Sequence, residues 1–519
     1  MRPWPRIRAT RLIAAWRRSL FRAALQPPLP SLLLDRHCRF HLPETRPTLC
    51  AYFWDGALVL LCYKVDSLDR DKCALAEIWL YVVVMSARTG SSGARQQRLA
   101  VYLDRLAEAA GHADRGVPLR LYCTGLLLPG ERKSVEPMAA RLAPDNVRRM
   151  HQSLHHLVAD APWSDEAVLN CVRDQALAAM RKSGPVVAWI VDDTGLPKKG
   201  THSVGVARQY CGQTGKQDNC QVAVSLSVAT WKASLPIAYR LYLPELWACD
   251  SQRRQQARIP SEILFESKLQ IALGQIRQAM ADGIAQGTVL ADPAYGNDTS
   301  FREAVAGLEL SYVLGVQSTI TVWPPGTQPL SAPKYSGRGR PASRLRRDPE
   351  HMPVSAKQLA LSLPARAWKT VTWREGTRRP LRSRFSAVRI RPAHRDHKLQ
   401  QPREREWLLI EWPRDEAEPR KYWLSNLATH IRLRDLVALA KQRWIIERDY
   451  QELKQELGLG HFEGRGWRGF HHHATLCIAA YGFLVAERCR FSPSPRSGHL
   501  ELSVPELPPQ FRPRGAHPA

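Results

Sequence analysis

The sequence lacks the features that mark zinc-binding, disulfide-stabilised and membrane-spanning proteins. Its 11 cysteines are scattered along 519 residues without a C-x-x-C pair, which argues against a zinc module and a disulfide framework. This usage favours a reduced, cytoplasmic setting. The apolar runs at 57–63 and 78–85 are too short to cross a bilayer. We therefore expect no membrane association, and the chain contains no internal repeats.

Acidic residues are also scarce relative to basic ones. The chain has 48 Asp and Glu against 75 Lys and Arg, a formal charge of +27 and a pI of about 10.0. Such an excess favours a polyanionic partner, most often nucleic acid, although a merely soluble basic protein can carry it too. With 44% hydrophobic residues, most of the chain should be globular, and its length suits two or three domains.

The two ends of the chain have a different composition from the rest. Residues 1–34 are rich in Arg and contain no acid before Asp35. This segment could be a targeting peptide, a DNA-binding arm or translated sequence upstream of a start at Met85. We treat residues 1–96 as a poorly defined basic extension. The Pro-rich tail at 491–519 is expected to be disordered.

Between these ends the residue pattern changes three times. Residues 97–182 predict a helical domain, which would bind DNA through exposed Arg and Lys or serve as a structural cap. Residues 183–319 alternate apolar strands with helices. Residues 320–430 are rich in Pro, Arg and Trp with short strands, and look like a separate insertion with a DNA-facing loop at 338–347. Residues 431–490 return to helices.

The stretch 432–457 has no Gly or Pro and many helix-forming residues, so it predicts one long helix. At about 100° per residue, Arg443, Glu447 and Lys454 fall within roughly 40° of one another and share one stripe. Glu452 and Glu456 point away from that stripe. Alone, the stripe is typical of surface salt bridges; with further acids nearby, it could bind metal and phosphate.

Two such acids follow apolar runs upstream. Asp192 ends the predicted strand WIVD, and Asp292 ends the predicted strand TVLAD. If the strands are neighbours, the carboxylates meet there, and Glu447 on a following helix completes a set of three. Three carboxylates at one point need cations between them, and Mg²⁺ bound by oxygen ligands is suited to phosphoryl transfer. A strand-end Asp can instead cap a turn or helix.

The segments VDDTGLPKKGTHSVGVARQYCG, ADPAYGN, RWIIERDYQELKQELGLGHFEGRGW and GLLLPGERKSVEPMA resemble bacterial insertion-sequence transposases of the DDE superfamily. The resemblance covers about residues 98–488. It implies an α/β fold, with an RNase H-like mixed sheet flanked by helices, an N-terminal helical domain and a β-rich insertion before the last Glu.

The third family motif, Tyr-x2-Arg-x3-Glu-x6-Lys, is matched by Arg443, Glu447 and Lys454, whereas Ala440 stands at the Tyr position. The first motif places the catalytic Asp two residues before a Thr, which selects Asp192 over Asp193. The second motif has Tyr and Gly after its Asp, as at 295 and 296.

The resemblance implies that Asp192, Asp292 and Glu447 are the catalytic and metal-binding residues, with Mg²⁺ or Mn²⁺ as cofactor. It also implies DNA contacts by Arg443 and Lys454. Lys198 and Lys199, in the loop after the first Asp, are further candidates for phosphate binding, or else they form a solvated loop.

Aromatic and histidine clusters offer weaker signals. Some relatives stack a flipped base on an aromatic residue of the insertion. Trp323, Trp368 and Trp373 could do this but are better explained as core residues. The cluster at 471–473 is three consecutive histidines, which spread around a helix and cannot converge on a metal. We expect them to form a polar helix start or to contact DNA.

Together these features predict a metal-dependent DNA transposase. The resemblance implies that it cleaves the ends of an insertion sequence and joins the freed 3′-OH to target DNA, acting as a dimer or larger synaptic complex on terminal inverted repeats. Two alternatives remain: a non-catalytic DNA-binding protein derived from a transposase, and a nuclease without strand transfer.

Overall fold

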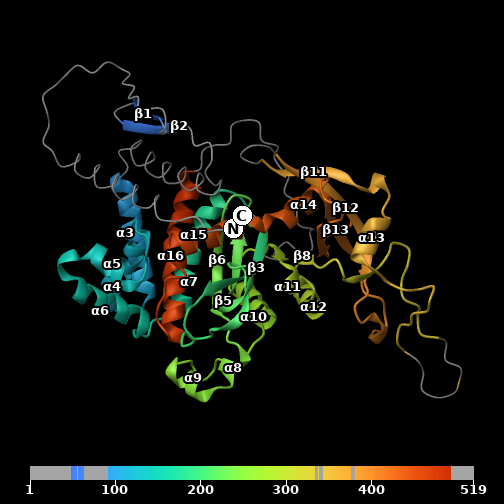
Figure 1. Ribbon diagram of the computed structural model, residues 1–519, viewed down its shortest axis with the longest axis horizontal. Helices are drawn as coiled ribbons and strands as arrows, with labels where there is room; N and C mark the ends of the chain where they lie inside the picture. The colour runs from blue at the N-terminus through green and yellow to red at the C-terminus, as the bar shows by residue number, and fades with distance from the viewer. Residues whose placement is uncertain are drawn as a thin grey trace, which may run out of the picture. The chain divides into compact units, whose positions relative to one another are not determined.

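The computed structural model describes residues 48–54, 57–63, 92–333, 337, 343–375 and 380–491 (Figure 1). It divides into two units, residues 1–98 and 99–519. In the first unit, β1 (Thr48–Trp54) and β2 (Ala57–Tyr63) form an antiparallel hairpin with Thr48 opposite Tyr63. Residues 1–47, 55–56 and 64–91 of the basic extension, residues 338–342 of the predicted loop and the tail from 492 lie outside the described residues. No helix in the described part of the chain is long and apolar enough to span a membrane.

The region predicted to be helical is helical. It contains α3 (Ser92–Ala109), α4 (Ala113–Leu127), α5 (Val135–Leu142), a 3-10 turn (Pro144–Asn146), α6 (Val147–Ala159) and α7 (Asp165–Lys182). Ser164 caps α7 by accepting a hydrogen bond from the Ala167 N–H, as its small hydroxyl side chain at that position predicts.

The core sheet begins with β3 (Ala188–Pro197), β4 (Ala207–Cys211), β5 (Lys216–Ala229) and β6 (Ser234–Leu241), followed by β7 (Thr288–Ala291) and β8 (Tyr312–Val316). Its central order is β6-β5-β3-β7-β8. β3, β7 and β8 run parallel, whereas β5 is antiparallel to β3 and β6. This confirms the predicted α/β, RNase H-like mixed sheet.

Along the chain, five helices separate β6 from β7 and β7 from β8. They are α8 (Glu245–Ala248), α9 (Ser251–Gln256), α10 (Lys268–Ala281), α11 (Pro293–Gly296) and α12 (Thr299–Gly307). Ser267 and Gln270 form a capping box that fixes the start of α10. This places Lys268 in the first turn of α10, where its side chain reaches the core sheet.

The β-rich segment forms β9 (Thr321–Trp323), β10 (Val354–Ser355), α13 (Ala356–Ser362), β11 (Lys369–Arg374), β12 (Leu381–Pro392), β13 (Glu406–Trp412) and β14 (Lys421–Ser425). Two 3-10 turns, Ala365–Ala367 and Asp396–Lys398, connect them. β14 pairs with β8, so these strands extend the core sheet into one sheet of 12 strands. Composition indicates a separate insertion at 320–430. The pairing of β14 with β8, which joins this segment to the core sheet, cannot be predicted from composition.

The predicted single helix at 432–457 is two helices, α14 (Leu433–Gln442) and α15 (Trp444–Gln455). The residue between them, Arg443, keeps helical backbone angles (φ −56°, ψ −24°), so the interruption is local. Neither Gly nor Pro is present at this point to indicate an interruption of the helix. On the far side of α15, Glu452 pairs with Arg448 and Arg488, which confirms that it points away from the stripe.

The last helix, α16 (Trp467–Phe491), packs against α7 and β6 (Figure 1). His472 and His473 on it are each 1% exposed, so the expected DNA contact by this cluster is wrong. His472 stacks on Trp163 with ring centroids 3.7 Å apart. Nδ1 of His473 lies 2.8 Å from the Tyr122 hydroxyl. The histidines instead join α16 to the helical region.

Candidate active site

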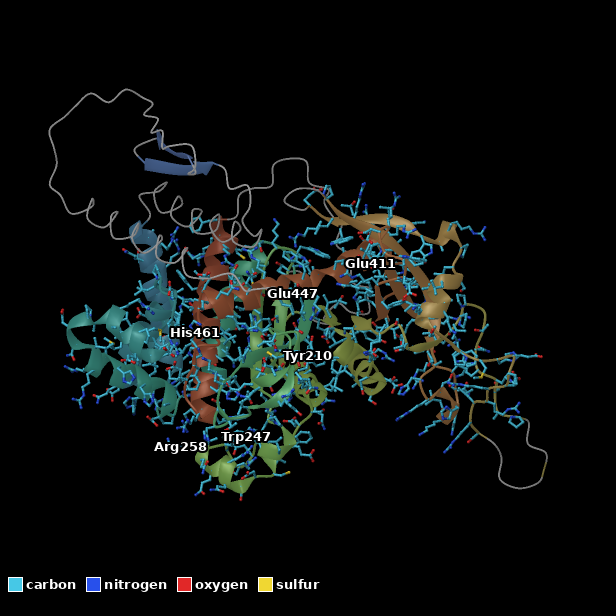
Figure 2. All side chains as sticks on the ribbon, viewed as in Figure 1. Tyr210, Trp247, Arg258, Glu411, Glu447 and His461 are labelled. Atoms are coloured by element: carbon cyan, nitrogen blue, oxygen red, sulfur yellow. The ribbon has the colours of Figure 1, made fainter. Side chains whose placement is uncertain are left out.

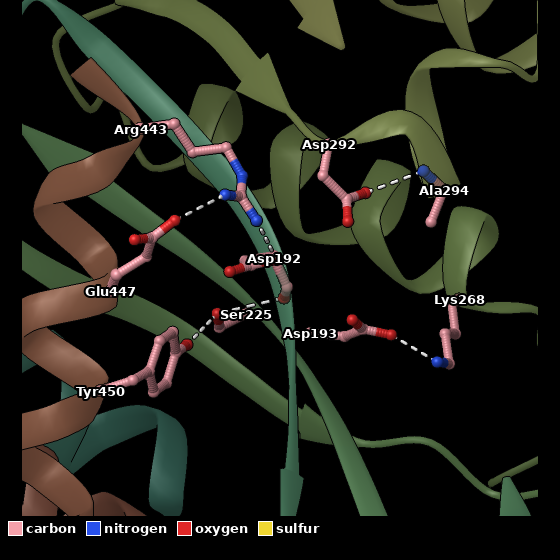
Figure 3. A network of polar contacts seen from close by, with 9 residues as sticks. All are labelled: Asp192, Asp193, Ser225, Lys268, Asp292, Ala294, Arg443, Glu447 and Tyr450. Atoms are coloured by element: carbon pink, nitrogen blue, oxygen red, sulfur yellow. Dashed lines mark hydrogen bonds and ion pairs between the residues drawn. The ribbon is translucent and has the colours of Figure 1, made fainter. Parts of the chain in front are cut away.

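Asp192 lies on β3, and Asp292 lies directly after β7, the neighbouring parallel strand. β3 and β7 pair through Ile190 and Leu290, and each Asp is two residues further along its chain. Asp292 follows β7 directly and caps α11, where its Oδ1 accepts a hydrogen bond of 2.9 Å from the Ala294 N–H. The two side chains face the same space at this edge (Figure 3).

The expectation that Asp192 ends its strand is wrong. β3 continues to Pro197, and Asp192 pairs with Ser225 on β5. The apolar run ends at Val191, but the backbone pairing with β5 does not, because hydrogen-bonded register is independent of side-chain polarity. Asp192 is therefore held in the middle of a strand, 9% exposed.

A close backbone approach fixes the position of Asp292. A Cβ on Gly296, at the end of α11, would lie 1.9 Å from the Gly315 carbonyl oxygen on β8. Only Gly fits there, because any side chain would push α11 away from the sheet. The Gly noted after the second acid thus has a packing role that seats the helix capped by Asp292.

Arg443 connects the third carboxylate to the first. Its guanidinium donates to Asp192 Oδ1 at 3.0 Å and to Glu447 Oε1 at 3.3 Å (Figure 3). Asp192 and Arg443 are largely buried, whereas the Glu447 side chain is 68% exposed. The structure therefore brings Glu447 and Arg443 to the aspartates, with Arg443 bonded to the carboxylates.

Burial raises the pKa of Asp192 to about 7; the positive charge of Arg443 opposes the rise, while Asp292 and Asp193 add to it. Burial also raises the pKa of Asp292, and the positive charge of Arg443 again opposes the rise. Burial alone would lower the pKa of Arg443. The negative charges of Asp192, Asp292 and Glu447 outweigh this effect, so the pKa of Arg443 is raised. The site thus concentrates negative charge that one cation only partly compensates.

Asp193, the neighbour of Asp192, points elsewhere and binds a different cation. Its carboxylate forms an ion pair with Lys268 of α10 (Figure 3). Adjacent strand residues face opposite sides of a sheet, which explains the division. Sequence analysis did not identify Lys268.

Two hydroxyl groups join the strand of Asp192 to the helix of Glu447. The Tyr450 hydroxyl on α15 hydrogen-bonds to Ser225 Oγ, and Ser225 Oγ donates to the Asp192 carbonyl oxygen at 3.3 Å. Both residues are buried. Neither Tyr450 nor Ser225 was identified as a site residue from the sequence. The available signal was Ser225 itself, one of two serines in the apolar second half of β5, at 222–229.

Two of the three predicted lysines bond to backbone carbonyl oxygens. Lys454 Nζ donates to the Gly195 carbonyl oxygen at 3.0 Å, and Lys198 Nζ donates to the Phe462 carbonyl oxygen at 2.7 Å. Burial lowers the pKa of Lys454 and lowers that of Lys198 to about 8. Lys199 is exposed. Each bonded lysine has a neutral partner, so its charge is not cancelled there.

The aromatic candidates do not approach the carboxylates through any described contact. Trp323 is 1% exposed, and its indole N–H donates to Asp396 at 2.5 Å. Trp373 is partly buried under Lys441, whose Nζ is 4.4 Å from the ring centroid. Trp368 packs edge-on against Trp412. These contacts agree with the core interpretation of all three.

The residues present suit a hard divalent cation, since Asp192, Asp292 and Glu447 all offer carboxylate oxygens. Burial and neighbouring carboxylates raise the pKa of both aspartates, so a bound cation would relieve repulsion there. Within the described residues, no three His, Cys, Asp or Glu side chains lie close enough together to hold a metal as placed. Arg443 lies between Asp192 and Glu447 instead.

A family model described as DDE superfamily endonuclease matches residues 105–380, just over half of the chain. The chain therefore belongs to the DDE superfamily of endonucleases, whose members generally use divalent metals. The match includes Asp192 and Asp292 and ends before Arg443 and Glu447.

A curated relative from Microchaete diplosiphon, described as a probable transposase for insertion sequence element IS701, is 29% identical over 189 residues. The aligned region is 36% of this chain and 45% of that protein. The chain thus spans less than half the length of the relative it matches. The predicted family, an insertion-sequence transposase of the DDE type, is supported by both comparisons.

Proposed function

We propose that this protein is a transposase that cleaves DNA at the ends of an insertion sequence and transfers the freed 3′-OH to target DNA. The observation that carries the proposal is that Arg443 bonds both Asp192 and Glu447, while Asp292, at the end of the neighbouring strand, faces the same space. The substrate would be double-stranded DNA bearing terminal inverted repeats. A dimer or larger complex would hold two ends.

In this proposal Asp192, Asp292 and Glu447 hold Mg²⁺ or Mn²⁺. When bound, the ions supply activation of the attacking hydroxyl and neutralisation of charge on the phosphate. The protein's own contribution is position: strand pairing fixes Asp192, the cap of α11 fixes Asp292, and α15 presents Glu447. Burial of the aspartates excludes water and strengthens their interaction with any bound cation.

The cations divide into two groups by their partners. Arg443 balances the carboxylates, and its planar guanidinium contacts two of them at once. Lys454, Lys198 and Lys199 would bind DNA phosphates, because their present partners are neutral or absent among the described residues. Binding should therefore weaken steeply with added salt.

The test uses purified full-length protein, Mn²⁺ or Mg²⁺, and DNA carrying the element's own ends. Glu447→Gln removes one charge at nearly constant volume, so we expect loss of cleavage by at least 100-fold, since the lost charge acts mainly in the transition state. DNA affinity, measured by fluorescence anisotropy, should stay within about threefold, because Glu447 repels phosphate rather than binding it.

Glu456→Gln is the matched control, since Glu456 is an exposed acid just after α15. It should cleave like the wild type. Full activity of Glu447→Gln would overturn the assignment of the site. Cleavage without joining to target DNA would favour a nuclease, and salt-dependent binding without cleavage by the wild type would favour a non-catalytic DNA-binding protein.

A further inference from the structure

A cleft of about 600 Å³ lies beside the candidate DNA-binding lysines. One wall is the turn before α5, with Glu131 and Arg132. The other wall is the loop after β3, from Pro197 to Ser203. Its floor is the loop at 460–463, which follows α15. Three segments far apart in the sequence thus form one concave surface next to the catalytic strand.

The cleft carries three cations. Lys198 is held over the floor by its bond to the Phe462 carbonyl oxygen. Lys199 is exposed and makes no hydrogen bond or ion pair with the residues that the structure describes. Arg132 is also exposed and forms an ion pair with Glu463, whose carboxylate is 60% exposed. Glu131 and Glu463 supply the only negative charges among the residues that line this cleft.

His461, labelled in Figure 2, adds a neutral donor to the floor. Its Nδ1 accepts a hydrogen bond of 3.1 Å from the Lys133 N–H. The ring proton of a neutral imidazole must then sit on Nε2. Burial lowers the pKa of His461, and the charges of Arg132, Lys133 and Lys198 lower it further. Three cations therefore act on one ring at the base of the cleft.

The floor and the first wall are locked together. Lys133 is 2% exposed, and its Nζ donates to the carbonyl oxygens of Leu126 and Leu128. Gly458 has φ +71°, and a Cβ there would lie 2.4 Å from Lys133 Cβ. Glycine is needed at that position on both grounds. The cleft is a built feature rather than a gap between loosely placed loops.

We propose that this cleft binds the phosphate backbone of DNA, and that it extends the phosphate contacts from the catalytic strand to the helical region through Arg132. The inference rests on the proposed function of the protein. Cations combined with neutral N–H and O–H donors are the groups that contact phosphate oxygens. Glu463 is the competing anion, and a bound phosphate takes its place beside Arg132.

The test is the salt dependence of DNA affinity for the full-length protein, measured by anisotropy with a labelled duplex. Each phosphate contact contributes about 0.9 to the slope of log affinity against log salt. Arg132→Gln should therefore reduce the slope by about that amount and weaken binding at low salt. Glu463→Gln should strengthen binding, because it removes the competitor without removing a cation.

Arg420→Gln is the matched control. Arg420 is an exposed arginine of the β-rich segment that pairs with Glu416 and does not line the cleft. It should leave the slope unchanged. Equal effects of Arg420→Gln and Arg132→Gln, or weaker binding by Glu463→Gln, would overturn the proposal. Circular dichroism spectra of the variants establish that each is folded.

Two further outcomes separate the possible failures. If the wild type shows no salt-dependent DNA binding, the proposed function fails together with this inference. If the wild type binds DNA but Arg132→Gln has the wild-type slope, only the cleft assignment fails. Inorganic phosphate is the alternative ligand. In that case micromolar phosphate alone would raise the melting temperature of the wild type but not of Arg132→Gln, while the two proteins would share the same salt slope for DNA. That result would identify a site for free phosphate and contradict the DNA assignment.

Discussion

Single charged residues set the electrostatics of the carboxylate site. Asp192 is buried beside Asp292, and burial raises the pKa of both. Arg443 opposes this because it contacts Asp192 directly and Glu447 as well. Burial of like charges in one place is costly unless cations compensate. A divalent cation held by these carboxylates would therefore reduce the repulsion between them.

A second buried pair holds the helix before the site. Lys441 Nζ on α14 lies 2.7 Å and 2.6 Å from the two carboxylate oxygens of Glu411 on β13. The Glu411 side chain is 6% exposed and that of Lys441 14%. This pair fastens α14, and with it Arg443, to the extended part of the sheet.

Lys441→Met should leave the Glu411 carboxylate buried without its cation. We expect the free energy of unfolding, measured by urea denaturation, to fall by about 3 kcal/mol or more. The double variant Lys441→Met/Glu411→Leu, which buries no charge, should recover most of this loss. A single variant as stable as the wild type would show that the pair does not hold α14.

At the scale of elements, α15 is fastened on two sides. Tyr450 reaches Ser225 and, through it, the backbone of Asp192 on β3. The adjacent Asp449 accepts hydrogen bonds from Ser234 on β6 and from the Tyr481 hydroxyl on α16, the latter at 2.6 Å. Only the hydrogen bond of Tyr450 connects α15 to the strand that carries Asp192.

Tyr450→Phe should therefore slow DNA cleavage more than its effect on stability predicts. A net loss of about 1 kcal/mol in positioning corresponds to roughly a fivefold lower rate. Tyr481→Phe is the control, because it also removes one buried tyrosine hydroxyl from the contacts of α15. The measurement compares cleavage rates with melting temperatures for both variants. Equal slowing by the two would mean that the link to Asp192 has no special role.

Helix prediction from sequence succeeded for α15 but not for its junction with α14. The spacing of Arg443 and Glu447 placed both on one side, and they do contact each other. The interruption at Arg443 was not predictable, since no local residue causes it. Likewise, the apolar run before Asp192 revealed a buried strand but not its continuation to Pro197, which depends on pairing with β5.

At the scale of the whole molecule, α16 ties the helical region to the catalytic core. His471 Nε2 accepts from the Leu241 N–H at 3.2 Å, at the end of β6. His472 lies 3.0 Å from the Val158 carbonyl oxygen, and His473 lies 3.0 Å from the Gly458 carbonyl oxygen. Three consecutive side chains of one helix thus reach a strand, a helix and a loop.

These contacts predict a pH-dependent stability. Burial lowers the pKa of His473 to about 4, whereas an exposed histidine titrates near about 6.5. Between these values the unfolded chain takes up a proton that the folded protein does not. The stabilising effect of a neutral His473 is therefore complete above about pH 6.5 and is lost as the pH falls toward 4.

Urea denaturation of the wild type and of His473→Gln at pH 7 and pH 5 measures this effect. The wild type should lose on the order of 2 kcal/mol more than the variant over this change. Comparison with the variant is necessary because burial raises the pKa of Asp165 and Asp449 to about 7, which gives the opposite dependence. Equal losses in both proteins would show that His473 is not buried in the neutral form.

The sequence by itself determined the class of fold and the candidates for the site. Apolar runs ending near Asp192 and Asp292, and the spacing of Arg443, Glu447 and Lys454, are local patterns. The tertiary structure decided which groups touch: Arg443 with Asp192, Lys268 with Asp193, and Tyr450 with Ser225. These partners are between 75 and 251 residues apart in the chain. Such contacts follow from strand register and helix docking, which depend on packing across the whole sheet and not on neighbouring residues.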